Sequence, residues 1–221
     1  MRVRRALTTL AAALTVATLT ATTPAAAAPL TFTVSMKGLS AEAAFSNFPT
    51  NGTPVPGRVY TDVFVFTADE ATTVDGTTFT DDFAFVDVFK YTFDRRGFPV
   101  LVSDRSGQAS GDRVTFTADS RKLTTASLTA RVPMETCTET GCSPSGTATI
   151  SVTWTGDGPT TTFKSSYRTN DPGQFHASGR LTGTSRMATA RGSVPVLGNA
   201  TAIYGSITSS KSAERTICHG C

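Results

Sequence analysis

Residues 59–93 read VYTDVFVFTADEATTVDGTTFTDDFAFVDVFKYTF, and this stretch decides the fold class. Apolar and polar residues alternate with a period of two on both sides of Asp75-Gly76, which is typical of β-strands. Asp-Gly is a strong signal for a two-residue hairpin turn, because both turn positions need a positive φ. The stretch therefore predicts a β-hairpin in which Val74 pairs with Thr77.

This register sorts the hairpin side chains onto two faces, since successive residues of a strand point to opposite sides. One face is aliphatic and carries Val59, Val63, Val65, Ala84, Val86 and Val88. The other face carries aromatic rings and two acids, and its members are Tyr60, Asp62, Phe64, Phe66, Phe85, Asp87, Phe89 and Tyr91. Both faces are largely apolar, so we expect both to be covered, or one of them to line a cavity.

The aromatic face is the main candidate for a site. Its rings can stack on a sugar or a lipid-like body while nearby carboxylates bind polar groups. The residues expected to bind are Tyr60, Phe64, Phe89 and Tyr91.

The two acids of this face allow a second interpretation. Asp62 and Asp87 become diagonal neighbours across the hairpin, and paired carboxylates can act as acid and base in glycoside hydrolysis. A third interpretation is structural, with each acid paired to an arginine or a hydroxyl. Of the two functional readings, we favour binding over catalysis.

The same register places Asp69 opposite Asp82 and Glu70 opposite Asp81, where like charges repel each other. With Asp75, these acids supply enough oxygens for a calcium ion. Their spacing, however, matches no calcium-binding loop. We therefore expect a solvated acidic loop and no metal site.

Composition extends the β assignment to the whole chain. After residue 27 the chain has 34 Thr and only seven Leu, and Thr favours pleated sheets whereas Leu favours helices. Closely spaced strands without helices between them pair antiparallel. We expect an antiparallel β-sandwich or β-barrel of about ten strands. The expected strands are 30–37, 58–68, 77–94, 97–103, 112–119, 122–132, 146–156, 160–169, 174–191 and 200–211.

Two segments are expected to lack regular structure. Residues 38–58 contain several prolines and glycines and predict a long connector, with room for one helical turn at 41–45. Residues 105–112 are polar and glycine-rich and predict a hairpin loop.

The N-terminus has the pattern of a secretory signal peptide. A basic start (Arg2, Arg4, Arg5) precedes an apolar stretch and then the small residues Ala25–Ala28, so we expect cleavage after Ala27. Residues 28–221 would form a single secreted all-β domain, with no membrane span in the mature chain. Without the leader, 17 basic residues balance 17 acidic ones, which argues against a nucleic-acid partner.

In its leader and its Ala/Thr-rich, Lys-poor composition, the chain resembles exported proteins of high-GC Gram-positive bacteria. The resemblance covers composition and the first 28 residues only. It points to no family and no catalytic residue.

Four cysteines in an exported chain predict disulfides. Their spacing favours Cys137–Cys142 and Cys218–Cys221, and a crossed pairing is the alternative. Zinc or redox chemistry at the terminal Cys-His-Gly-Cys has less support, because no βαβ unit accompanies it and a fourth zinc ligand is missing.

The remaining candidate residues carry little chemistry. Trp154 is expected in the core and His176 in a strand, and no motif for a nucleophile, a phosphate or a dinucleotide is present. We expect a secreted, non-enzymatic binding or cell-envelope module for a small amphipathic or carbohydrate ligand, without a cofactor. The alternatives are a glycosidase-like hydrolase and a structural extracellular protein without a ligand.

Overall fold

The computed structural model describes residues 29–49, 52–138, 141–171 and 175–218. The expected signal peptide, residues 1–27, and Cys221 lie outside these residues. The described elements are β1 (Leu30–Ser46), β2 (Tyr60–Val74), β3 (Thr77–Phe93), β4 (Pro99–Ser110), a 3-10 turn (Gly111–Arg113), β5 (Val114–Ala118), β6 (Thr125–Thr138), β7 (Gly141–Asp171), β8 (Phe175–Val194), β9 (Gly198–Thr201) and β10 (Tyr204–Cys218).

All strand pairings are antiparallel and belong to one sheet. The strand order is β10-β1-β2-β3-β4-β6-β7-β8-β9, and β5 pairs with β6. In addition, β8 pairs with β10, so the pairings lead from β10 through the sheet and back to β10. The expectation of an antiparallel all-β chain with about ten strands is confirmed. No helix in the described part of the chain has the length and apolar character needed to cross a bilayer.

The β2–β3 hairpin has the register that its turn predicted. At the end far from the turn, Tyr60 pairs with Tyr91. Asp75 and Gly76 have φ values of 47° and 88°, as a type I′ turn requires. The Asp75 carboxylate accepts hydrogen bonds from the amide (2.7 Å) and the hydroxyl (3.1 Å) of Thr33, which hold the turn against β1.

The connector after β1 is shorter than expected. Residues 38–46 continue β1, so the predictions of an irregular segment there and of a helical turn at 41–45 are wrong. Ala41, Ala43 and Phe45 alternate into the core and are at most 1% exposed. Small residues on both faces hide this alternation in the sequence, and only packing reveals it.

Two other boundaries differ from expectation. Residues 105–110 complete β4 instead of forming a loop. The expected strands 146–156 and 160–169 are a single strand, β7, whose register with β8 shifts after Gly156. A bulge lets one strand absorb turn-forming residues without leaving the sheet.

The core lies between the aliphatic face of β1–β3 and the inner faces of β5–β8. It contains Val63, Val65, Val86 and Val88, each at most 1% exposed. Trp154 of β7 is also 1% exposed, as expected for a core residue.

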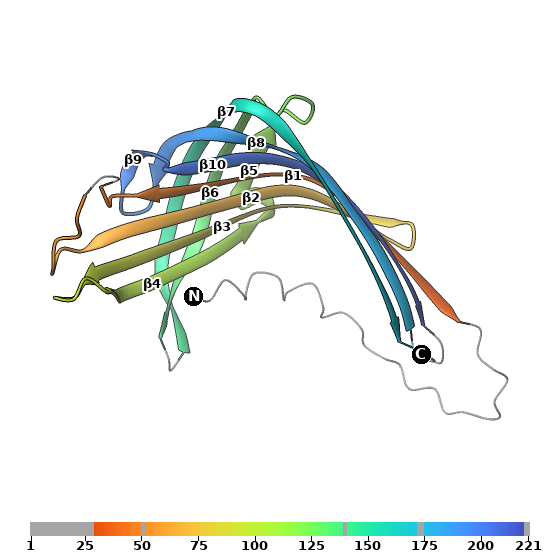
Figure 1. Cartoon of the computed structure of the whole chain (residues 1–221), viewed down its shortest axis with the longest axis horizontal. Helices are drawn as coiled ribbons and strands as arrows, with labels where there is room; N and C mark the ends of the chain where they lie inside the picture. Colours follow the sequence, from red (N-terminus) through yellow and green to blue (C-terminus); the bar gives the residue numbers. More distant parts are fainter. Residues whose placement is uncertain (1–28, 50–51, 139–140, 172–174, 219–221) are drawn as a thin grey trace.

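The sheet is bent into an arch (Figure 1). The core occupies one half of the arch. The outer parts of four strands extend beyond it, and we call them the tail: residues 30–38 of β1, 160–171 of β7, 175–186 of β8 and 208–218 of β10. Much of the tail is exposed on both of its faces, so it has no core of its own.

Candidate binding face

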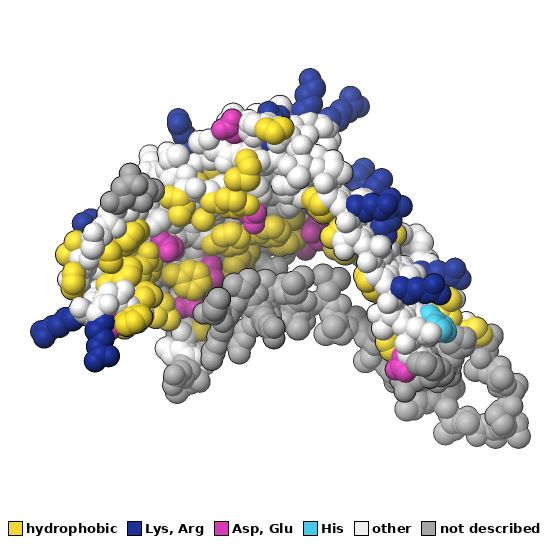
Figure 2. All heavy atoms as spheres, in the orientation of Figure 1, with side chains coloured by type: hydrophobic (Ala, Val, Ile, Leu, Met, Phe, Trp, Pro, Cys, Tyr) yellow, Lys and Arg dark blue, Asp and Glu magenta, His cyan; other side chains and the backbone are white. Residues whose placement is uncertain are grey.

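The aromatic side of the β2–β3 hairpin lies on the inside of the arch. Of the two apolar hairpin faces, the core covers only the aliphatic one. Figure 2 shows hydrophobic side chains gathered inside the arch, with acidic side chains among them. We call this surface the concave face, and its residues are Glu42, Ser46, Asp62, Phe64, Phe66, Phe85, Asp87, Phe89, Tyr91, Asp104 and Ser106.

The central rings of this face are neither fully buried nor fully exposed. Phe64, Phe89 and Tyr91 all have intermediate exposure. Each of these rings therefore presents part of its surface to solvent, where a ligand can pack against it.

One end of the concave face is closed by a cluster of four rings. Phe48, from the segment after β1, lies 4.9 Å from Tyr60 and 5.8 Å from Phe93, measured between ring centroids. Tyr60 is 6.0 Å from Tyr91, and its hydroxyl accepts a hydrogen bond from the amide of Val55 (3.0 Å). Tyr60 is therefore 1% exposed and supports Tyr91 from below the surface.

Sequence reasoning missed Phe48. It lies in the segment expected to be a connector, and no pattern links it to the hairpin. The available signal was an aromatic residue directly before Pro49 in a segment rich in proline.

Asp62 and Asp87 lie on the same face, as the register predicted, in neighbouring rows. The Tyr91 hydroxyl donates a long hydrogen bond of 3.4 Å to Asp62 Oδ1. Burial and the Asp62 carboxylate raise the pKa of Tyr91, so its hydroxyl remains a donor at any physiological pH.

Asp87 has a different environment. Its Oδ1 is buried and has no hydrogen-bond partner in the described part of the chain. Burial and the neighbouring Asp104 carboxylate raise the pKa of Asp87 to about 7, and a hydrogen bond between the two carboxyl groups adds to the effect. Near neutral pH Asp87 is thus protonated in a large share of molecules, and it can donate as well as accept a hydrogen bond.

Asp104 was not among the residues expected at the site. It pairs with Phe89 across β3 and β4, which brings it beside Asp87 on the concave face. The expected strand ended at residue 103, so its sequence position suggested the start of a loop. The β3–β4 register also shifts between Lys90 and Tyr91, and such a shift cannot be counted from a turn.

A fourth carboxylate of the concave face comes from β1. Glu42 Oε1 accepts hydrogen bonds from the hydroxyls of Tyr204 (2.8 Å) and Ser206 (3.0 Å) on β10. The backbone carbonyl of Glu42 accepts one from Trp154 Nε1 (2.8 Å). This acid is held by structural contacts, unlike Asp87.

The acidic pairs of the β2–β3 hairpin occur in the expected register. Asp69 and Asp82 lie on one side of the sheet, whereas Glu70 and Asp81 lie on the other. Burial and then the charge of Asp81 raise the pKa of Glu70, and burial and then the charges of Asp69 and Asp81 raise that of Asp82. The acids are thus divided between the two faces of the hairpin.

The cysteines are structural in the described residues. Cys137 and Cys142 form a disulfide, as expected, and close the turn of the β6–β7 hairpin. Cys218 is also disulfide-bonded, and its expected partner Cys221 lies outside the described residues. The one cluster of metal-ligating types found in the described chain combines Glu135 with the bonded pair Cys137 and Cys142, so its sulfurs are not available to a metal ion.

Comparisons of the chain with protein-family models, with curated proteins and with solved structures found no match.

Proposed function

We propose that the protein is a secreted, non-enzymatic binding module that holds a small amphipathic or carbohydrate ligand on its concave face. One observation carries the proposal: half-exposed rings lie beside the Asp87 Oδ1 oxygen, which is buried without a partner among the described residues. Phe64 and Phe89 lie directly opposite Asp87 and Asp62, respectively. The basic, apolar and small-residue segments of the N-terminus support export.

The chemistry of the face suits a ligand with one apolar side and several hydroxyls. Phe89 and Tyr91 offer ring faces on which the C–H side of a sugar or an acyl chain can pack. Asp87, when protonated, can donate to a ligand oxygen and accept from a ligand hydroxyl. Side chains cover Asp87 Oδ1 in this structure, so a ligand hydroxyl would reach it only after they move; the hydrogen bond formed would then remove the cost of a buried oxygen without a partner, about 1–3 kcal/mol.

For the architecture of this module we propose a barrel in preference to a two-sheet sandwich. The pairing of β8 with both β7 and β10 supports this. Because β10 is also the first strand in the order of the sheet, the hydrogen-bonded strands form a closed ring. A closed circuit leaves few unpaired edges in the body of the protein.

The test uses dodecyl maltoside, which joins an acyl chain to a sugar, with maltose and dodecanoate as the separate halves. Titration calorimetry on the purified protein should detect binding of dodecyl maltoside or of one of its halves. Phe89→Ala should weaken it by about tenfold or more, because a ring stacked in an interface is worth about 1–3 kcal/mol. Phe98→Ala is the control, since Phe98 is 64% exposed in a turn outside the concave face.

The proposal fails if none of the three compounds binds, or if both variants weaken binding equally. Binding of maltose alone would identify a carbohydrate ligand. Binding of dodecanoate alone would identify a lipid-like one.

A hydrolase is the second candidate, and the pKa of about 7 at Asp87 beside Asp104 favours it. Acid–base catalysis needs one carboxyl group that is protonated and one that is ionised near neutral pH. The pair is then Asp87 and Asp104, whereas the sequence suggested Asp62 and Asp87. Hydrolysis of aryl glycosides that is lost in Asp87→Asn, with binding intact, would support an enzyme. If the unmodified protein shows no turnover, the hydrolase is excluded for these substrates and the binding module remains the proposed function.

A further inference from the structure

The tail carries a second surface, on the side of the sheet opposite to the concave face. Lys37 of β1 pairs with Lys211 of β10, Lys211 with Thr182 of β8, and Thr182 with Lys164 of β7. These four residues share one face, because directly paired residues point to the same side of a sheet. Residues two or four positions along each strand share that face as well. Six cations of this face are exposed: Lys37, Lys164, Arg168, Arg180, Lys211 and Arg215. A seventh, Arg186, has intermediate exposure and donates a hydrogen bond to the Lys122 carbonyl (3.1 Å).

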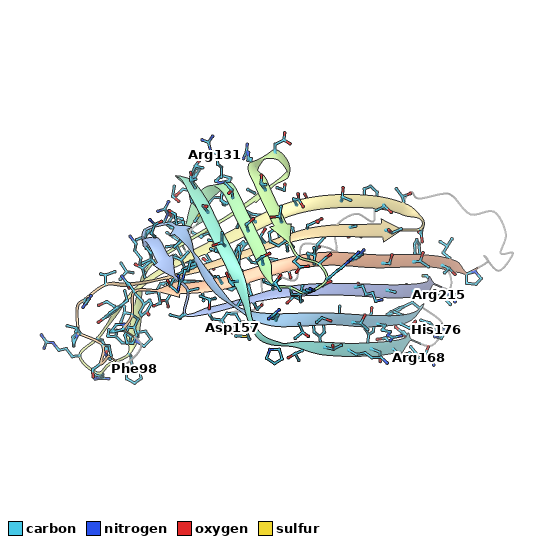
Figure 3. The ribbon with its side chains drawn as sticks, turned by 90° about the horizontal axis from the view of Figure 1, so that it is seen from above. Phe98, Arg131, Asp157, Arg168, His176 and Arg215 are labelled. Atoms are coloured by element: carbon cyan, nitrogen blue, oxygen red, sulfur yellow. A yellow bond between two sulfur atoms is a disulfide. The ribbon has the colours of Figure 1, made fainter. Side chains whose placement is uncertain are left out.

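We call this surface the cationic face. Figure 2 shows Lys and Arg side chains along the outer side of the tail, and in Figure 3 Arg168, Arg215 and His176 lie together near its end. Neighbouring strands are about 4.8 Å apart and alternate residues about 7 Å apart. The cations are therefore spaced at intervals of roughly 5–14 Å over four strands, and the directly paired Lys37 and Lys211 are the closest of them.

The charges of the cationic face are not balanced locally. Over the described residues, β1, β7, β8 and β10 bring no acidic side chain to this side of the tail. Glu214 and Asp171 point to the other side by register, and the Tyr167 hydroxyl is hydrogen-bonded to Glu214 there. The nearest acids on the same side belong to the β2–β3 hairpin at the border of the face: Asp69, Asp75 and Asp82.

One contact shows the imbalance directly. Lys37 and Lys211 are cross-strand partners, and like charges in this arrangement destabilise a sheet. A bound anion would relieve that repulsion. The sequence places these two lysines far apart, so their pairing is a property of the fold alone.

Hydroxyl groups lie between the cations, together with aliphatic carbon atoms. Arg168, Arg180 and Arg215 border a depression of about 570 Å³. Its polar lining on the same face comes from Thr33, Ser35, Thr73, Ser166 and Ser178. A second depression continues along the tail between Arg180 and the two lysines 37 and 211. Cations and hydroxyl groups thus alternate along a track that is several residues long.

We propose that the cationic face binds a linear anionic polysaccharide, with carboxylate, sulfate or phosphate groups repeated along the chain. Guanidinium and ammonium groups would bind the anionic groups, and the Ser and Thr hydroxyls would bind sugar hydroxyls. Among the described residues of this face, His176 is the one ring on which a nucleic-acid base could stack, and no Phe, Tyr or Trp side chain accompanies it. Ile217, at the end of the tail, is the one large apolar side chain on the described part of this face, whereas a protein that inserts into a lipid surface presents a continuous apolar face.

This proposal goes beyond the ligand of the concave face, because it uses the opposite side of the sheet and a different half of the arch. A binding module with one site for a small ligand and one for an acidic polymer would be retained at an acidic cell envelope. Either site can fail its test without affecting the other.

The experiment measures binding of the purified protein to dextran sulfate, with uncharged dextran of the same length as the control ligand. Dextran sulfate should bind and dextran should not, and the affinity should fall as salt rises. Arg180→Gln/Arg215→Gln should weaken binding by at least tenfold. The matched control is Arg95→Gln/Arg131→Gln, which removes the same charge from exposed positions outside the tail (Arg131 in Figure 3) and should change affinity less than threefold.

A second variant keeps the test independent of any folding defect in the first. Lys37→Gln/Lys211→Gln should weaken dextran sulfate binding while raising the thermal midpoint, since it removes a like-charge pair. Binding of dodecyl maltoside should stay unchanged in all three double variants.

Three outcomes would overturn the proposal. The first is no binding of dextran sulfate at low salt. The second is an equal loss of affinity in the tail variants and the control variant. The third is tighter binding of a single-stranded oligonucleotide, or of vesicles with anionic lipid, than of dextran sulfate at the same ionic strength.

Discussion

Asp87→Asn should stabilise the protein above pH 7 and change its stability little at pH 4. In the folded protein, burial and Asp104 raise the pKa of Asp87 from 3.8 to about 7. Between these two values the folded state binds a proton that the unfolded state has lost. The free energy of unfolding therefore falls as the pH rises through this range. Asparagine carries no charge, so Asp87→Asn removes this loss of stability at high pH.

The magnitude follows from the size of the shift. A difference of about three pKa units corresponds to about 4 kcal/mol at 1.36 kcal/mol per unit. Asp87 keeps some contact with solvent, which screens the charge, so about half of this value is a realistic effect, about 2 kcal/mol. For a domain of this size, 1 kcal/mol shifts the thermal midpoint by about 2–4 °C. The variant should thus melt about 4–8 °C above the unmodified protein at pH 8.

The assay is urea or thermal unfolding of both proteins at pH 4, 5, 6, 7 and 8. The difference between the two proteins is the quantity to follow, because Glu70 and Asp82 also have raised pKa values and contribute to each profile. Asp112→Asn, at an exposed aspartate, is the control and should reproduce the profile of the unmodified protein. A difference between Asp87→Asn and the unmodified protein that is the same at pH 4 and pH 8 would refute the reasoning.

Two further predictions concern the sheet itself. Gly192→Ala should lower the free energy of unfolding by about 2–3 kcal/mol, because a Cβ would collide with the Ser151 carbonyl oxygen and lie 2.7 Å from Val152 Cα. Urea unfolding of this variant, with Ser193→Ala as the control, measures the effect. An unchanged urea midpoint in Gly192→Ala would contradict the prediction. Replacing Cys137 and Cys142 together by serine should cost about 2 kcal/mol, the value expected for so short a closed loop. A loss well above this in the same assay would mean that the disulfide holds more than its own hairpin.

The sequence specified the part of the fold that local chemistry controls. A two-residue Asp-Gly turn admits one pairing of its flanking strands, and that pairing then fixes every cross-strand neighbour from Val74–Thr77 to Tyr60–Tyr91. The aromatic face with Asp62 and Asp87 followed from counting residue pairs outward from the turn, because alternate residues of a strand share a face. The all-β class followed from the surplus of Thr over Leu.

Tertiary structure decided everything that depends on strands distant in the chain. Asp104 reaches Asp87 only through the β3–β4 register and its shift, and Phe48 reaches Tyr60 only because the segment after β1 folds onto the hairpin end. The pairing of β1 with β10 and of β10 with β8 gathers the cations of the tail. The conformation of a turn depends on adjacent residues, so it can be predicted from the sequence. The pairing of strands that are distant in the chain depends on the burial and hydrogen bonding of the whole sheet, so only the tertiary structure shows it.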